Sequence, residues 1–220
     1  MTTIEKQWIS FWSSHEDDGS TGTFYGKWLF KKKLQLLREA LGILPDKKLK
    51  VLDIGCGSGV TLKVFRDSGF SNLYGVDISP FAIERCEALG LIKGKNVFIG
   101  DARRMNFQTQ SFGVVFEEGL WEHYTNYVPF ILEMCRISSD YLIAIQPNHF
   151  SLVGAMAKIG WEIFSKNRGG VREYSIPLSY FRRTITSCGF VKVFEGFTTF
   201  KTCSCMIFRR KEKCKLGTML

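Results

Sequence analysis

The sequence predicts an α/β fold whose sheet is mostly parallel, and three observations support this prediction. Between residues 49 and 148, short β-branched apolar runs alternate with amphipathic stretches, as in strand–helix–strand units on a parallel sheet. A glycine-rich run directly follows the first of these strands. The chain then ends with a helical pattern and two adjacent strand patterns, which favour an antiparallel hairpin.

The elements of the alternating region follow one another in the order that such units require. The strands are expected at residues 50–54, 72–76, 96–99, 112–116 and 141–146. The helices between them are expected at residues 60–67, 80–89 and 129–137, the last with Pro129 in its first turn. A further amphipathic helix at residues 25–44 precedes this region and is expected to pack on the sheet.

The last part of the chain begins with a second amphipathic helix, expected over residues 151–164. Gly189 is expected to be the C-cap glycine of the helix after it. The elements that follow residue 164 are a loop at 166–170, a helix at 179–187, and the two strands of the hairpin at 190–196 and 199–208.

Composition places the chain among soluble globular proteins. Its 220 residues are 45% apolar and 23% charged, which excludes disordered, collagenous and membrane-spanning classes and favours one domain. No apolar run reaches the roughly 18 residues of a spanning helix, and the N-terminal residues do not resemble a secretory signal. We therefore expect a cytoplasmic protein whose seven cysteines, an odd number, are reduced thiols.

The positive charge is concentrated in the last third of the chain. Lysine and arginine outnumber aspartate and glutamate by 30 to 21, a formal net charge of +9. Residues 1–48 contribute +2 (8 basic, 6 acidic), residues 49–147 contribute −2 (9 and 11) and residues 148–220 contribute +9 (13 and 4). Because the charge is so uneven, a uniformly basic nucleic-acid binder is disfavoured.

Glycines and aspartates at the strand ends predict a nucleotide-like ligand. The run GCGSG, Gly55–Gly59, lies between a strand and a helix, where its backbone can turn sharply and approach a ligand beside a helix N-terminus. Asp53, Asp77 and Asp101 follow at intervals of 24 residues, so they gather along the carboxyl edge of the sheet. A tight turn without a ligand would leave Asp77 and Asp101 unexplained, and a nicotinamide oxidoreductase would have no use for Asp53 or Asp101.

This ordered set of motifs resembles that of the class I S-adenosylmethionine-dependent methyltransferases, and is similar to the small-molecule branch that includes quinone-biosynthesis methyltransferases. The resemblance covers roughly residues 45–150. It implies a Rossmann-like, seven-stranded, mostly parallel sheet with helices on both faces, in which the C-terminal hairpin completes the sheet. It also implies S-adenosylmethionine as the cofactor.

The resemblance assigns two groups of residues to the cofactor. One group surrounds the nucleoside: Asp77 would hold the ribose, Ile78 would pack on adenine, and Asp101 with the Ala102 backbone would read the adenine edge. The other group lies under the methionine and methyl end, with Asp53 beside the amino group. Its members are Asp53, Gly55, Cys56, Gly57, Gly59, Glu117 and Glu118.

A general base is needed only if the acceptor loses a proton during methyl transfer, because the sulfonium carbon is already activated. The candidates are Glu122 and His123, a pair that resembles the family at this place, although His123 can equally orient the next helix. Tyr25 precedes the first predicted helix, where relatives place a lid, and a buried aromatic is its alternative. Some relatives bind a divalent metal through Glu-x-x-Glu-His, but Gly119 occupies the first of these positions, so we expect no metal.

The helix at residues 151–164 stands where this class usually builds a cap over the acceptor. Its apolar stripe of Leu152, Met156, Ile159 and Ile163 suggests a hydrophobic or aromatic substrate. The same stripe also fits packing on the core or on a partner subunit, and docking on a membrane surface. The expected parts of the domain are a helical lid at 1–44, a cofactor-binding core at 45–148, this cap at 149–176, and a helix with the hairpin at 177–220.

The sequence therefore predicts an S-adenosylmethionine-dependent methyltransferase that transfers a methyl group to a small-molecule acceptor by in-line displacement. An RNA or protein methyltransferase is an alternative, because the basic C-terminal third offers a surface for nucleic acid. A non-catalytic module that binds S-adenosylmethionine is another. The sequence leaves the oligomeric state open.

Overall fold

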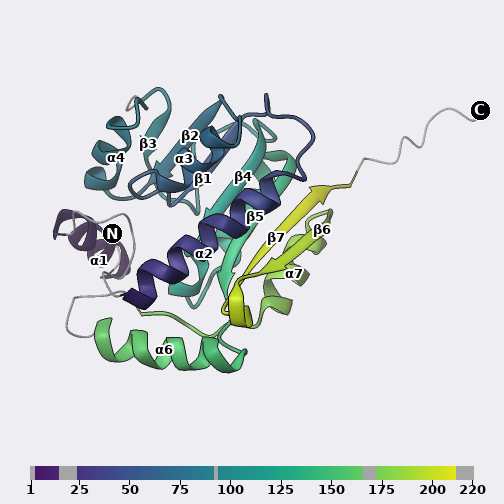
Figure 1. The fold of residues 1–220 in the computed structure, drawn as a ribbon. Coiled ribbons are helices and arrows are strands. Elements are labelled where there is room, and N and C mark those ends of the chain that lie inside the picture. The colour runs from purple at the N-terminus through teal and green to yellow at the C-terminus, as the bar shows by residue number, and fades with distance from the viewer. Residues whose placement is uncertain (1–2, 15–23, 92–93, 166–171, 212–220) are drawn as a thin grey trace, which may run out of the picture.

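One mixed sheet organises the described residues, which are 3–14, 24–91, 94–165 and 172–211 of this computed structural model (Figure 1). The strand order is β3-β2-β1-β4-β5-β7-β6; β1 to β5 are parallel, and β7 is antiparallel to both of its neighbours. The α/β fold with a C-terminal antiparallel hairpin is confirmed. The strands are β1 (Val51–Ile54), β2 (Leu73–Asp77), β3 (Val97–Ile99), β4 (Phe112–Glu118), β5 (Ser138–Pro147), β6 (Phe190–Phe197) and β7 (Cys203–Arg210).

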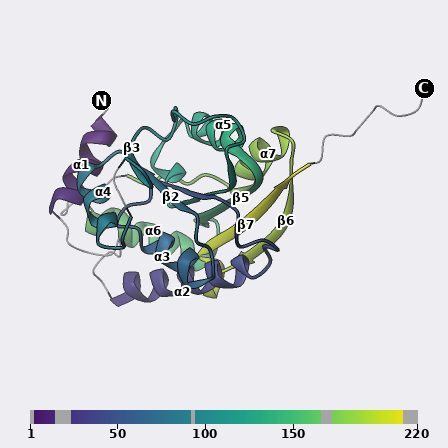
Figure 2. The ribbon, with the colours of Figure 1, turned by 90° about the horizontal axis from the view of Figure 1, so that it is seen from above.

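Helices cover both faces of the sheet, which separates two apolar layers (Figure 2). The first layer joins the sheet to α2, α3 and α4, and the second joins it to α5 and α7. The helices are α1 (Thr3–Ser14), α2 (Phe24–Leu41), α3 (Val60–Asp67), α4 (Pro80–Glu87), α5 (Val128–Ile137), α6 (Leu152–Ser165) and α7 (Leu178–Ser187), with short 3₁₀ helices η1 (Trp121–His123) and η3 (Thr199–Lys201).

The central strands are apolar because both of their faces are covered. All four residues of β1 are buried, as are the first six of β4. Val51 of β1 pairs with Leu73 of β2 on one side and with Val114 of β4 on the other, so the parallel strands end at one edge. That edge is where the predicted ligand-binding residues gather.

The C-terminal hairpin begins later than its sequence pattern predicts. The last strand is expected from residue 199, but β7 begins at Cys203 because η3 intervenes. Within η3, Phe200 and Lys201 have φ angles of 61° and 54°, in the left-handed region that no strand residue adopts. Gly189, the predicted C-cap glycine, has a φ of 86° just after α7.

Two further observations concern segments outside the sheet. Residues 3–14 form α1, which the sequence analysis did not predict, and the predicted loop at 166–170 lies outside the described residues.

Among the helices that the structure describes, none combines the length and the apolar character needed to cross a membrane. The six cysteines within the described residues are free.

Candidate active site

A cavity that is open to solvent lies at the carboxyl edge of β1, β2 and β4. Its walls come from the glycine loop, the strand ends and the turn after β3, and its roof comes from α1. Nine of the eleven residues predicted to bind a cofactor line it: Asp53, Gly55, Cys56, Gly57, Asp77, Ile78, Asp101, Ala102 and Glu118.

The glycine loop adopts a conformation that side chains would oppose. Gly55, Gly57 and Gly59 have φ angles of 71°, 50° and 79°. A Cβ atom on Gly57 would come within 2.6 Å of the Trp12 ring, so this position requires glycine for space as well as for conformation. Gly59 does not line the cavity; it is the N-cap residue of α3, and it shapes the loop from outside.

Two buried carboxylates brace the loop. The Asp77 carboxylate accepts hydrogen bonds from the backbone N–H groups of Gly57 and Ser79, both at 2.9 Å, and burial raises its pKa despite these bonds. The Asp53 carboxylate accepts a hydrogen bond from the Thr61 hydroxyl, and burial raises its pKa well above the ordinary value. A carboxylate accepts about four hydrogen bonds, so Asp77 retains acceptor capacity toward the cavity.

The third carboxylate is tied to an arginine that the sequence analysis missed. Arg103 lines the cavity, and its Nη2 lies 2.6 Å from Oδ2 of Asp101. Burial favours the neutral acid, but the hydrogen bonds and charge of Arg103 outweigh it and lower the pKa of Asp101. Arg103 also forms an ion pair with Glu5 of α1, whose carboxylate is buried. The turn after β3 is thereby joined to the roof.

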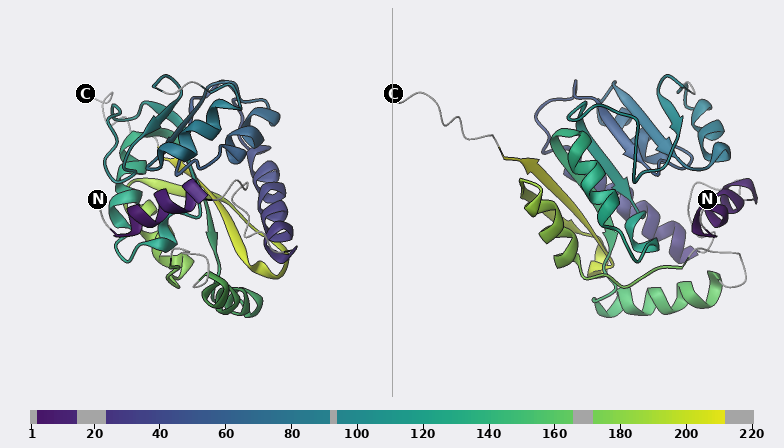
Figure 3. Two further views of the ribbon diagram at one scale, coloured as in Figure 1. Left: turned by 90° about the vertical axis from the view of Figure 1, so that its left-hand side faces the viewer. Right: turned by 180° about the vertical axis from the view of Figure 1, so that it is seen from behind.

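The roof is α1, which carries Glu5, Trp8 and Trp12 into the lining. This helix packs against α4 (Figure 3). Arg85 of α4 donates a hydrogen bond of 2.8 Å to the Trp12 carbonyl oxygen, and its guanidinium lies 5.4 Å from the Trp12 ring centroid. The sequence predicted a lid within residues 1–44, but it placed the lid at the start of the later helix, α2, and not at α1. Tyr25, its candidate residue, is 40% exposed, stacks on Trp28 at 5.8 Å and lies outside the lining.

The end of β4 places its two glutamates on opposite faces of the strand. Glu118 lines the cavity and forms an ion pair with Lys33 of α2. Burial opposes the charge of Lys33, but the Glu118 carboxylate raises the pKa of Lys33 overall. Glu117, predicted beside the cofactor, instead lies outside the lining; it is fully buried and accepts hydrogen bonds from Gln146 Nε2 at 2.9 and 3.0 Å.

The predicted proton acceptors lie behind the cavity wall. Glu122 and His123 of η1 are buried, and neither lines the cavity. His123 Nδ1 donates to the Arg172 carbonyl oxygen at 3.0 Å, and burial lowers the pKa of its imidazole. The backbone N–H of Tyr174 donates to the Glu122 carbonyl oxygen at 2.6 Å. These bonds hold the start of the segment after α6 against η1.

A second histidine lies close to this group. His149 Nε2 is 3.2 Å from Oε2 of Glu173, and both side chains are largely buried. The charge of Glu173 adds to the effect of burial on Glu122, and together they raise the pKa of Glu122 to about 8. Within the described ranges, no group of three or more His, Cys, Asp or Glu side chains is arranged to hold a metal ion.

Residues 52–140 match the family model described as a methyltransferase domain. The match runs from β1 to the start of β5 and includes the glycine loop. The chain also has a sequence relative, described as a probable tocopherol O-methyltransferase, chloroplastic, from Oryza sativa subsp. japonica. The two are 26% identical over 145 residues, which is 60% of this chain and 40% of the relative, so the match spans less than half of that protein.

Solved structures show the same fold at low sequence identity. A magnesium protoporphyrin IX methyltransferase from Synechocystis PCC 6803 with bound S-adenosylhomocysteine has a TM-score of 0.65 and 22% identity, over 94% of each chain. A possible histamine N-methyltransferase from Thermotoga maritima has a TM-score of 0.66 and 17% identity, over 94% of this chain and 100% of that one. The chain thus has the Rossmann-like fold of these structures.

Proposed function

We propose that this chain is an S-adenosylmethionine-dependent methyltransferase that binds its cofactor in the cavity and methylates a small molecule. The observation that carries the proposal is the meeting of Asp53, Asp77 and Asp101 with the glycine loop around one cavity. Gly57 has no room for a side chain, so a ligand can approach the backbone of the loop closely and bind it through polar groups.

Each part of the lining has a chemical role in this proposal. The free acceptor positions of Asp77 suit two vicinal ribose hydroxyls, and Ile78 beside it offers an apolar surface to adenine. Asp53 and the backbone of the glycine loop suit the amino and carboxylate groups of the methionine part. When bound, S-adenosylmethionine supplies a methyl group already activated on a sulfonium.

The protein then contributes mainly position and exclusion of water. Trp8, Trp12 and Phe30 cover the cavity and make it apolar where the acceptor would approach. Glu122 and His123 lie behind the wall, so we assign them to holding η1, and with it Leu120, in place. Tyr25 does not line the cavity and has no role in this proposal.

Asp77 provides the sharpest test, because its loss removes a carboxylate without creating a cavity. We expect Asp77→Asn to weaken S-adenosylhomocysteine binding by roughly tenfold or more, as loss of a charge-assisted hydrogen bond does. Asp67→Asn, at an exposed carboxylate on α3 paired with Lys63, is the matched control and should bind like the wild type. Isothermal calorimetry measures both. Absence of affinity for S-adenosylmethionine and S-adenosylhomocysteine in the wild type would reject the proposal.

Turnover separates an enzyme from a module that only binds the cofactor. Transfer of a labelled methyl group in a broad screen of small acceptors should identify at least one product. The rice relative is named for methylation of tocopherol, a lipophilic phenol, so lipophilic phenols are the first acceptors to test. Methylation found only with RNA or protein would favour the alternative substrate class, and binding without any transfer would favour a non-catalytic module.

A further inference from the structure

Helix α6 presents its apolar stripe to solvent. Leu152, Met156, Ile159 and Ile163 are 81%, 65%, 59% and 61% exposed. They occupy positions i, i+4, i+7 and i+11, so they form one line of about 16 Å along a single helix face. In both views, α6 runs along the outer margin of the molecule, away from the sheet (Figures 1 and 3).

The side of α6 that carries Gly154 and Lys158 is turned toward the protein. Lys158 is only 23% exposed, and its Nζ bonds Ser175 Oγ at 2.8 Å and lies 3.4 Å from Oε1 of Glu162. Gly154 is buried against the carbonyl oxygen of Asn148. A helix that packs its apolar stripe on a core buries that stripe, whereas these four apolar side chains of α6 are more than half exposed. Packing of this stripe on the core is therefore excluded.

An exposed aromatic ring extends the stripe at η3, which packs against α6. Phe200 is 64% exposed, and its φ of 61° is a conformation that bulky side chains rarely adopt. Its ring lies 6.5 Å from that of Trp28, which holds it in place. Phe150, directly before α6, is also 64% exposed. The backbone thus keeps large apolar groups in water at some conformational cost.

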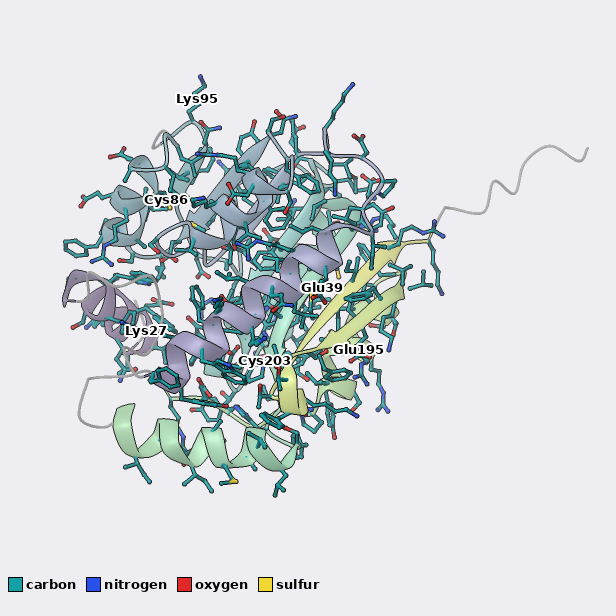
Figure 4. The ribbon with its side chains drawn as sticks, viewed as in Figure 1. Lys27, Glu39, Cys86, Lys95, Glu195 and Cys203 are labelled. Atoms are coloured by element: carbon teal, nitrogen blue, oxygen red, sulfur yellow. The ribbon has the colours of Figure 1, made fainter. Side chains whose placement is uncertain are left out.

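Exposed cations lie on segments that neighbour α6 in the structure or in the chain. Lys201 follows Phe200, Arg172 lies in the described segment after α6, and Lys27 lies at the end of α2 that is nearest α6 (Figure 4). The one acidic residue of α6, Glu162, is paired with Lys158. The surface is therefore apolar at its centre and positive at its margin, which matches an anionic interface.

We infer that α6 together with Phe150 and Phe200 is a docking surface for a phospholipid bilayer with anionic head groups. A helix with an apolar face and cationic flanks lies in the plane of such an interface, with its apolar residues among the acyl chains. A second copy of the chain fits less well, because a two-fold contact along this ridge would bring its cations together. None of the α6 residues whose side chains the structure describes lines the cavity, so the inference does not depend on the proposed function.

Flotation with vesicles tests this inference. The full chain should float with vesicles of phosphatidylcholine containing roughly 30% phosphatidylglycerol, and less with phosphatidylcholine alone. Met156→Asp/Ile159→Asp should lower the partition coefficient at least roughly tenfold. Phe81→Asp/Leu132→Asp is the matched control, since these exposed apolar residues on α4 and α5 receive the same charges, and it should float like the wild type.

Three outcomes would overturn the inference. The wild type could remain unbound with both kinds of vesicle, or the control could lose as much binding as the α6 variant. Light scattering could instead show a dimer that Met156→Asp/Ile159→Asp converts to monomers without vesicle binding, which would assign the surface to a second copy. Calorimetry with S-adenosylhomocysteine should be unchanged in the α6 variant, so a failure of this inference is distinguishable from a failure of the proposed function.

Discussion

Burial controls the charge of the side chains around the site. Asp53 and Asp77 are buried but receive hydrogen bonds from Thr61 and from backbone N–H groups, which partly offset the cost of an anion. Glu122 differs, because within the described residues its Oε2 has no hydrogen-bond partner. A buried carboxyl without a full set of donors favours the neutral form, in agreement with a pKa of about 8.

The pH dependence of stability should therefore contain a contribution from Glu122. Its pKa is about 8 in the folded state and about 4.3 in the unfolded state, so the folded state holds the proton between these values. This contribution is present below about pH 4 and is lost as pH rises toward 8. Glu122→Gln, which mimics the neutral acid, should gain up to about 3 kcal/mol relative to the wild type between pH 5 and pH 8.

Urea denaturation of both proteins at the two pH values measures this difference. The comparison cancels the other titrating groups, such as Glu173, which are present in both chains. Equal pH dependence in the two proteins would show that Glu122 titrates normally.

Helix α1 illustrates how an element is placed by contacts that lie far apart in the sequence. Trp8, Phe11 and Trp12 recur at helical spacing, so the pattern for a helix is present in residues 3–14. Its position as the roof depends on Arg85 and Arg103, from α4 and from the turn after β3. Nothing in the local pattern of residues 3–14 indicates these partners.

Loss of one of these arginines should loosen the roof while the sheet stays intact. In Arg103→Gln, the ion pair with Glu5 is lost, and amide hydrogens of residues 3–14 should exchange roughly five- to tenfold faster. Hydrogen exchange resolved by peptide mass spectrometry measures the effect. Arg104→Gln, at the exposed neighbouring arginine, should leave exchange unchanged. Equal protection of α1 in both variants would show that Arg103 does not hold the roof.

The whole molecule depends on one sheet with an apolar layer on each face. The layers share β1, β4, β5 and β7, so neither keeps its packing surface if the other is lost. The net charge is not spread evenly over the molecule. The net excess of +9 lies after residue 147, whereas residues 49–147, which contain most of the cavity lining, are slightly acidic. The positive charge thus bears on contacts outside the cavity.

A shared sheet predicts one cooperative unfolding transition, as expected for the predicted single domain. Far-ultraviolet circular dichroism reports the helices, and tryptophan fluorescence reports the surroundings of the five tryptophans, of which Trp121 is fully buried in the second layer. Their urea midpoints should coincide. Two separated transitions would show that the layers unfold independently and that the chain holds more than one folding unit.

The sequence by itself determined the order and type of the sheet elements and most of the cavity lining. Period-two and helical patterns are local, and strand ends in parallel units meet at one edge, so Asp53, Asp77 and Asp101 could be placed together without coordinates. Tertiary structure alone decided which face a side chain presents. It separated Glu118 from Glu117, moved His123 and Tyr25 out of the cavity, and turned the apolar stripe of α6 outward. These outcomes depend on packing partners distant in the chain, and periodicity identifies a face without identifying what covers it.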